Sequence, residues 1–148
     1  MDSSHISNLI KQIETLQNED DRVDFIKSLS PNLLLDIIER NVCWTVLSAI
    51  ISTGNHELIL KILEEDDLDW QVQLAIIRTG NIEFIKSLLK LKCLSFSAES
   101  AIASTGNNEL IKELLKREDL CWWVQKAIDE TGNPVYREIL RERFHYND

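Results

Sequence analysis

The sequence predicts an all-helical protein, a right-handed α-solenoid of stacked helical hairpins with about eleven helices. Two observations carry this prediction. The tripeptide Thr-Gly-Asn occurs four times, and successive copies are 26 residues apart; they begin at Thr53, Thr79, Thr105 and Thr131. A fixed period of this length is typical of proteins built from stacked repeats. Between the tripeptides, apolar residues recur at helical spacing, and the chain has no other glycine.

Equivalent residues form columns when the four copies are aligned from Val42, Leu68, Leu94 and Leu120. The eighth position is always alanine and the ninth is always isoleucine. Because alanine allows two helices to approach closely, we expect these positions to face neighbouring helices. The third position is aromatic in every copy: Trp44, Trp70, Phe96 and Trp122.

The tripeptide marks the turn inside each hairpin. Its glycine can take the left-handed conformation that ends a helix, and its asparagine can cap the next helix through the side-chain oxygen. In the fourth copy Pro134 follows the asparagine, as expected for the first residue of a helix. The sequence therefore predicts two helices in each unit.

We expect one domain over residues 1–148, with three parts. Residues 1–41 form an N-terminal helix and a degenerate repeat, residues 42–119 form three regular repeats, and residues 120–148 form a C-terminal capping repeat. In that last repeat Arg137 and Arg141 stand where the preceding copy has Ile111 and Leu115. A polar outer face of this kind is expected where nothing stacks further, so we expect the array to end at Asp148.

Composition and charge restrict the classes of partner. The net charge is −9, and residues 1–74 carry 14 acidic against 5 basic residues. So acidic a chain repels phosphate backbones, which disfavours direct nucleic-acid binding and favours a basic protein partner. The chain has three cysteines without CxxC spacing, no secretory signal and no apolar run of about 20 residues. We expect a cytoplasmic monomer that does not enter a membrane.

Half of each unit resembles the ankyrin repeat. The pattern Gly-x-x-Glu-apolar-apolar-x-x-Leu-Leu occurs at residues 80–89 and again at residues 106–115. The Thr-Pro-Leu-His tetrapeptide of ankyrin is missing, and the short unit leaves no room for its β-hairpin, so the whole chain is more similar to HEAT-like solenoids of helix pairs. That resemblance implies a protein-binding scaffold. In size, acidity and helical architecture the chain also resembles bacterial immunity proteins of contact-dependent growth inhibition, which implies that it neutralises a toxic nuclease domain.

Nothing in the sequence indicates catalysis or cofactor binding. The three histidines form no i, i+3 or i, i+4 pair with another histidine or a cysteine, and no phosphate-binding glycine loop, GxSxG or HExxH motif occurs. Each glycine is accounted for as a helix end. We therefore expect neither an enzyme nor a metal site.

An acidic run is the first candidate binding surface. It consists of Glu64, Glu65, Asp66, Asp67 and Asp69, and it lies in a loop that joins two repeats. The equivalent loops downstream have mixed charge, so the fold does not require this run. Glu19, Asp20 and Asp21 also join two helices, and they could lie along the same edge. Two interpretations stay open: a solvated loop, or a contact for a basic partner that relieves the repulsion among the acids.

The aromatic column is the second candidate surface. Trp44 and Trp70 could pack between repeats, because solenoid helices need broad apolar faces, or they could anchor a partner. Trp123 lies in a column otherwise held by polar residues, so it is a candidate binding residue or a cover for the C-terminal end.

Together these features predict an inhibitor that binds one basic protein, most concretely an immunity protein that blocks a nuclease toxin. The acidic run would imitate the phosphates of the toxin's substrate, with tryptophans anchoring the contact. The alternative is a general adaptor that holds a peptide or helix of its partner. An enzyme acting on nucleic acid would need a basic groove, and acids interrupt the only basic cluster.

Overall fold

The structure, a computed structural model, describes residues 3–40, 42–65, 67–91 and 94–147. Within these residues it has eleven helices and no strand, which confirms the predicted all-helical fold. The helices are α1 (Ser3–Thr15), α2 (Glu19–Lys27), α3 (Pro31–Glu39), α4 (Trp44–Ser52), α5 (His56–Leu63), α6 (Trp70–Arg78), α7 (Ile82–Leu88), α8 (Phe96–Ser104), α9 (Asn108–Leu115), α10 (Trp122–Asp129) and α11 (Pro134–Phe144).

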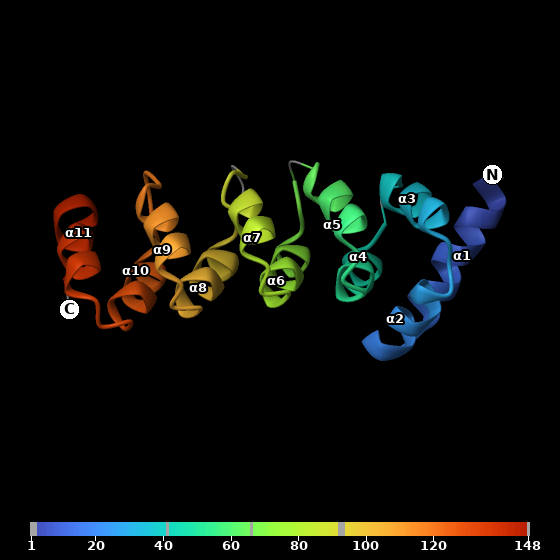
Figure 1. Cartoon of the computed structure of the whole chain (residues 1–148), viewed down its shortest axis with the longest axis horizontal. Coiled ribbons are helices and arrows are strands. Elements are labelled where there is room, and N and C mark those ends of the chain that lie inside the picture. The colour runs from blue at the N-terminus through green and yellow to red at the C-terminus, as the bar shows by residue number, and fades with distance from the viewer. Residues whose placement is uncertain (1–2, 41, 66, 92–93, 148) are drawn as a thin grey trace.

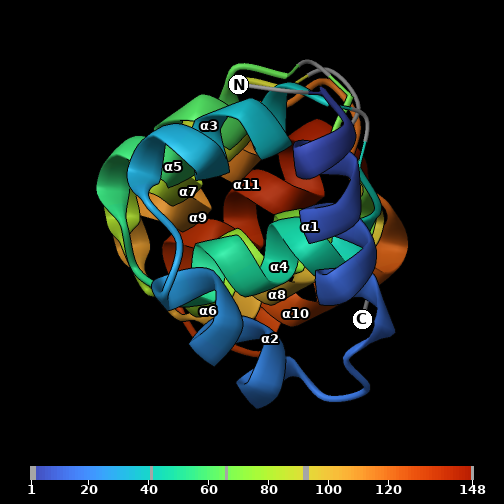
Figure 2. The ribbon, with the colours of Figure 1, turned by 90° about the vertical axis from the view of Figure 1, so that its right-hand side faces the viewer.

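The helices form two parallel rows along an elongated stack (Figure 1). One row contains α2, α4, α6, α8 and α10, and the other contains α3, α5, α7, α9 and α11. Helix α1 crosses the N-terminal end and packs on α2, α3 and α4. Seen from that end, the chain turns clockwise as it recedes from α4 through α5 to α6, so the stack is right-handed (Figure 2).

The core runs between the two rows for the length of the stack. The isoleucine column contributes one fully buried residue to each of α4, α6, α8 and α10: Ile50, Ile76, Ile102 and Ile128. Because helices in such a stack contact mainly their neighbours, each repeat must supply the same buried surface. This requirement explains why the column does not vary.

Each turn inside a hairpin is built as the tripeptide predicts. Gly54, Gly80, Gly106 and Gly132 have φ between 69 and 80°, a conformation that side chains with a Cβ rarely take. The threonine before each glycine donates its hydroxyl to the carbonyl of the core isoleucine, at 2.6–2.7 Å. The turn is therefore tied to the buried column.

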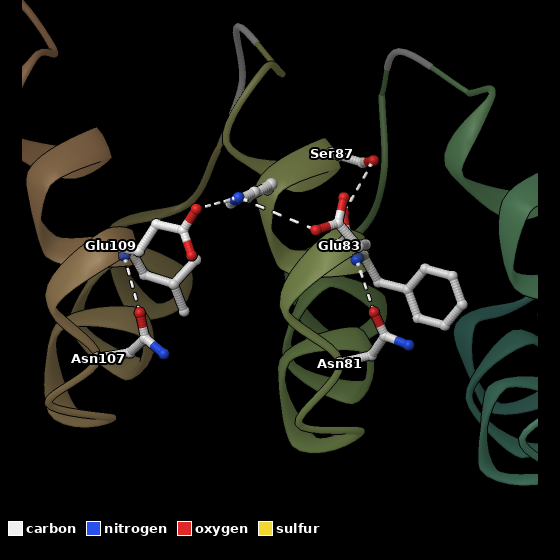
Figure 3. A network of polar contacts seen from close by, with 8 residues as sticks. Asn81, Glu83, Ser87, Asn107 and Glu109 are labelled. Carbon is white, nitrogen blue, oxygen red and sulfur yellow. Dashed lines mark hydrogen bonds and ion pairs between the residues drawn. The ribbon is translucent and has the colours of Figure 1, made fainter.

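The asparagine of each tripeptide caps the helix that follows. The Asn81 side chain accepts a hydrogen bond from the Phe84 N–H, and Asn107 accepts one from Leu110, both at 3.1 Å (Figure 3). Next to these caps Lys86 on α7 pairs with Glu109 on α9, and so connects two neighbouring repeats across the outer surface.

Longer polar side chains also connect successive repeats. Arg117 Nη1 donates to the Leu89 carbonyl at 3.2 Å, and Arg143 makes the equivalent bond to Leu115, 26 residues further along the chain. Both arginines therefore satisfy carbonyls at the end of a helix in the preceding repeat, where the helix itself has no further donor.

The N-terminal segment, residues 1–41, keeps only some features of the regular repeat. Ser30 caps α3 and Pro31 is its first residue, as predicted, and α3 packs on α5 as α5 packs on α7. Helix α2 packs on α4, but its first residue, Glu19, accepts a hydrogen bond from Ser52 at the last residue of α4, at 3.4 Å. The start of α2 therefore lies near the end of α4 rather than near its start.

Substituting Gly106 tests the conformational origin of the turns. A Cβ at this position would meet nothing within 4 Å, so any destabilisation must come from the positive φ of 69°. We expect Gly106→Ala to lower the free energy of unfolding by about 1–2 kcal/mol in urea titrations. Gly106→Asn should cost less, because asparagine tolerates this conformation. Equal stability of Gly106→Ala and the parent protein would contradict this explanation.

Candidate protein-binding edge

The aromatic column forms an exposed line along one edge of the stack. Trp44, Trp70, Phe96 and Trp122 are the first residues of α4, α6, α8 and α10, and their exposed fractions are 39, 50, 61 and 45%. Trp123, beside Trp122, is 63% exposed. Each ring is therefore only partly buried by its neighbours, and the rest of its surface is open to a partner. We call these five side chains the aromatic edge.

Their position at the helix start explains the exposure. Side chains of a helix lean toward its N-terminus, so a side chain on the first residue projects beyond the end of the helix. Two residues later the chain turns its side chains into the core, where Val46, Val72 and Val124 are fully buried. The repeat thus keeps an aromatic ring at the surface beside a well-packed helix.

A buried polar column supports this edge from beneath, and the sequence analysis missed it. Gln73, Glu99 and Gln125 lie at the same position of successive repeats and are buried. Gln73 donates to the Leu68 carbonyl at 2.8 Å and accepts from the N–H of Ser95 in the next repeat at 3.0 Å. Gln125 donates to the Leu120 carbonyl at 2.7 Å. A polar residue recurring between apolar columns was the signal that could have identified it.

Glu99 is the exception in this column, because it carries a charge. Arg117 Nε lies 3.1 Å from Glu99 Oε2, in an ion pair that is not aligned as a hydrogen bond. Burial raises the pKa of the Glu99 carboxyl above its ordinary value of 4.5, and the Arg117 guanidinium opposes that rise. Desolvation of the carboxylate is the larger effect.

A pocket opens in the aromatic edge between the starts of α4 and α6. It encloses about 500 Å³, and Trp44, Leu47 and Val72 supply apolar surface to it. Four carboxylates also line it, those of Glu39, Glu65, Asp67 and Asp69, with one guanidinium, that of Arg40. The structure therefore brings part of the acidic run and one aromatic ring into a single pocket.

The acids of the run differ in their partners. Glu64 is 3.2 Å from Lys61, and Asp69 caps α6 by accepting from the Gln71 N–H at 2.8 Å. Glu65 and Asp67 are exposed, and their carboxylates form no hydrogen bond or ion pair within the described residues. Asp66 lies outside the described residues. Two carboxylates are thus available to a partner.

The second acidic group does not join this site. Glu19, Asp20 and Asp21 form the first turn of α2, where their charges favour the helix dipole. Since Glu19 contacts the far end of α4, the whole length of that helix separates it from Trp44. The two acidic groups, which could have shared one edge, therefore lie toward opposite ends of α4.

The C-terminal end of the aromatic edge already holds a cation. Trp122 and Trp123 pack edge to face with ring centroids 4.9 Å apart. Lys126 Nζ lies 5.4 Å from the centroid of Trp122 and 5.8 Å from that of Trp123, within the range of cation–π attraction. The two ends of the edge therefore differ in charge.

The remaining features offer less chemistry. A larger hollow of about 680 Å³ lies on the turn side of α9 and α11, where glycines, asparagines and Glu130 line it. Among the described residues, no three histidine, cysteine or acidic side chains are placed to hold a metal ion. No helix in that part of the chain has the length and apolar character that crossing a bilayer requires.

No known protein family, curated protein or solved structure was found to match this chain.

Glu99→Gln tests the role of the buried column. We expect the amide to donate to the Leu94 carbonyl, as Gln73 and Gln125 donate to theirs, and to remove a desolvated charge. The free energy of unfolding at pH 7 should rise by about 0.5–1.5 kcal/mol. Because the folded state of the parent protein binds the Glu99 proton more tightly than the unfolded state, Glu99 destabilises less as the pH falls toward 4.5.

The advantage of the variant should therefore shrink between pH 7 and pH 5 in urea titrations. A lower stability of Glu99→Gln at pH 7 would show that the ion pair with Arg117 outweighs the desolvation of the carboxylate.

Proposed function

We propose that this protein is a cytoplasmic protein-binding module that inhibits one basic protein partner through the aromatic edge. The observation that carries the proposal is the line of exposed aromatic rings, which ends at Trp44 in a pocket lined by carboxylates. Soluble proteins seldom expose several large aromatic rings in one contiguous line without a partner for them. Tryptophan is also among the residues that contribute most to binding energy at interfaces.

The charge of the partner follows from the acidic end of the edge. Glu65 and Asp67 have no partner within the described part of the chain, and the first half of the sequence carries most of the negative charge. A basic surface would relieve their repulsion and would be steered toward this end before contact. An acidic or neutral surface would gain neither effect.

The most concrete form of this function is that of an immunity protein against a nuclease toxin. Nucleases expose cationic side chains to hold phosphates, and carboxylates spaced along a loop can occupy those side chains in place of the substrate. The size, acidity and helical-repeat architecture of the chain favour this form. In this mechanism Glu65 and Asp67 cover the cationic site, and Trp44, Trp70 and Trp123 supply apolar contact area.

A general adaptor is the second candidate, and the length of the aromatic edge favours it. Four repeats each present one ring on the same side of the stack, which suits a peptide or helix lying along the edge. An adaptor of this kind would depend on the rings far more than on the carboxylates.

Charge reversal with a matched control distinguishes these functions. Glu65→Lys/Asp67→Lys is compared with Glu118→Lys/Asp119→Lys, which changes the net charge equally in the loop before α10. Both variants are used to capture partners from the source cell, and any basic partner is then assayed for nuclease activity. We expect the first pair to lose the partner and its inhibition, while the control pair keeps both. Loss of the partner only after removal of the rings would favour the adaptor.

The association rate gives a second test. Steering by the carboxylates predicts that the rate constant for association falls by about tenfold or more between 20 and 300 mM salt, measured by stopped-flow fluorescence of the tryptophans. The dissociation rate should change much less. An association rate that does not depend on salt would remove the steering part of the proposal.

A further inference from the structure

We propose that the pocket between the starts of α4 and α6 binds one cationic side chain of the partner, an arginine or lysine, against the Trp44 ring. This inference rests on the proposed function and specifies its contact. The remainder of the partner segment lies along the aromatic edge toward α10, so the segment binds in one orientation, with its basic residue at the N-terminal end of the stack.

The C-terminal end of the same edge supports this inference. There the chain supplies its own cation, since Lys126 lies over both Trp122 and Trp123. The equivalent residue on α4 is Ser48, which is buried and uncharged, and on α6 it is Leu74. Trp44 and Trp70 therefore receive no cation from this position of the repeat, although they have the same place at the helix start.

The pocket wall is acidic. Four acidic residues and one arginine line the cavity, and Lys61 pairs with one of these acids, Glu39, at 3.5 Å, so an excess of negative charge remains. The carboxylates of Glu65 and Asp67 have no partner within the described residues, and both residues line this pocket together with Trp44. A cation over an aromatic ring is bound more strongly when carboxylates are also within reach.

The pocket also has the size and the apolar surface that such a side chain needs. A volume of about 500 Å³ accommodates a long side chain and part of its backbone, and the apolar surface from Leu47 and Val72 suits the methylene groups of arginine or lysine. The hollow at the second charged loop has about the same volume, 500 Å³, but Lys116, Arg117, Glu118 and Asp119 line it, two bases and two acids without an apolar or aromatic residue. A cationic side chain is thus expected at α4 and not at α10.

The test uses the whole protein and a defined probe, the peptide acetyl-Arg-Ala-Arg-Ala-Arg-amide. The four tryptophans give four indole N–H signals in a nitrogen-15 correlation spectrum, which single Trp→Phe variants assign. We expect a saturable shift of the Trp44 signal at low salt, with little change at Trp122 and Trp123. The same peptide with citrulline in place of arginine controls for everything except charge.

Two double variants complete the test, and each removes two negative charges. Glu65→Gln/Asp67→Asn should raise the dissociation constant of the peptide by about fivefold, as expected for the loss of two exposed charge pairs. Glu118→Gln/Asp119→Asn should leave it within about twofold. Equal weakening by both variants, equal binding of the citrulline peptide, or a shift confined to Trp122 and Trp123 would each overturn the inference.

Failure here can be separated from failure of the proposed function. If a basic partner protein binds the aromatic edge but the peptide leaves Trp44 unchanged, only the cation pocket is wrong. If the peptide binds as expected but no basic partner depends on Glu65 and Asp67, the proposed inhibitor function is wrong. Concentration-dependent broadening of the Trp44 signal without peptide would show that a second copy of this chain occupies the edge, and it would also overturn the inference.

Discussion

The packing of each first helix on the first helices before and after it is the interaction on which this structure depends. The core of this stack of hairpins runs along its whole length, so every unit must bury the same surface against its neighbours. The isoleucine column meets this requirement, and the threonine hydroxyl of each turn is bonded to its carbonyl. Because the period is constant, an exposed column of the repeat recurs at the same place on each unit and forms a line along the stack.

The aromatic edge is the functional consequence of that geometry. Its rings stay partly exposed at the helix starts, while valines two residues later are fully buried. Beneath them Gln73 and Gln125 satisfy loop carbonyls, so the loops that carry the charged residues are fixed to the helices. The charged residues along the edge can therefore differ between its two ends while the packing of the helices stays the same. Carboxylates surround Trp44, whereas Lys126 covers Trp122 and Trp123.

Most of the fold could be predicted from the sequence, because its local signals agree with one another. Glycine, asparagine and the proline at residue 134 fixed the helix ends, and the structure places these residues accordingly. The exposure of the rings could not be predicted, since helical periodicity does not show whether a first-turn side chain lies under a neighbour or beyond the helix end. The orientation of α2 was also missed. No glycine marks its end, and its direction depends on how it packs on α1 and α4.

The candidate site was predictable in its parts but not in its assembly. The acidic run and Trp44 stood out separately, and only the structure brings Glu65, Asp67 and Trp44 to one pocket. The same structure separates Glu19 from them, because the acidic turn of α2 meets the opposite end of α4. An acidic run in a sequence predicts an acidic surface. Which aromatic residue lies beside that surface depends on how the helices pack.

Oxidative footprinting of the tryptophans in complex with the captured basic partner tests the central claim most directly. Hydroxyl radicals oxidise exposed indoles, and all four tryptophans of the free protein are exposed. If the aromatic edge is the binding surface, the partner will protect Trp44 and Trp70 strongly, and Trp122 and Trp123 to the extent that it reaches α10. Unchanged oxidation of Trp44 and Trp70 in a saturated complex would place the partner elsewhere and contradict the account.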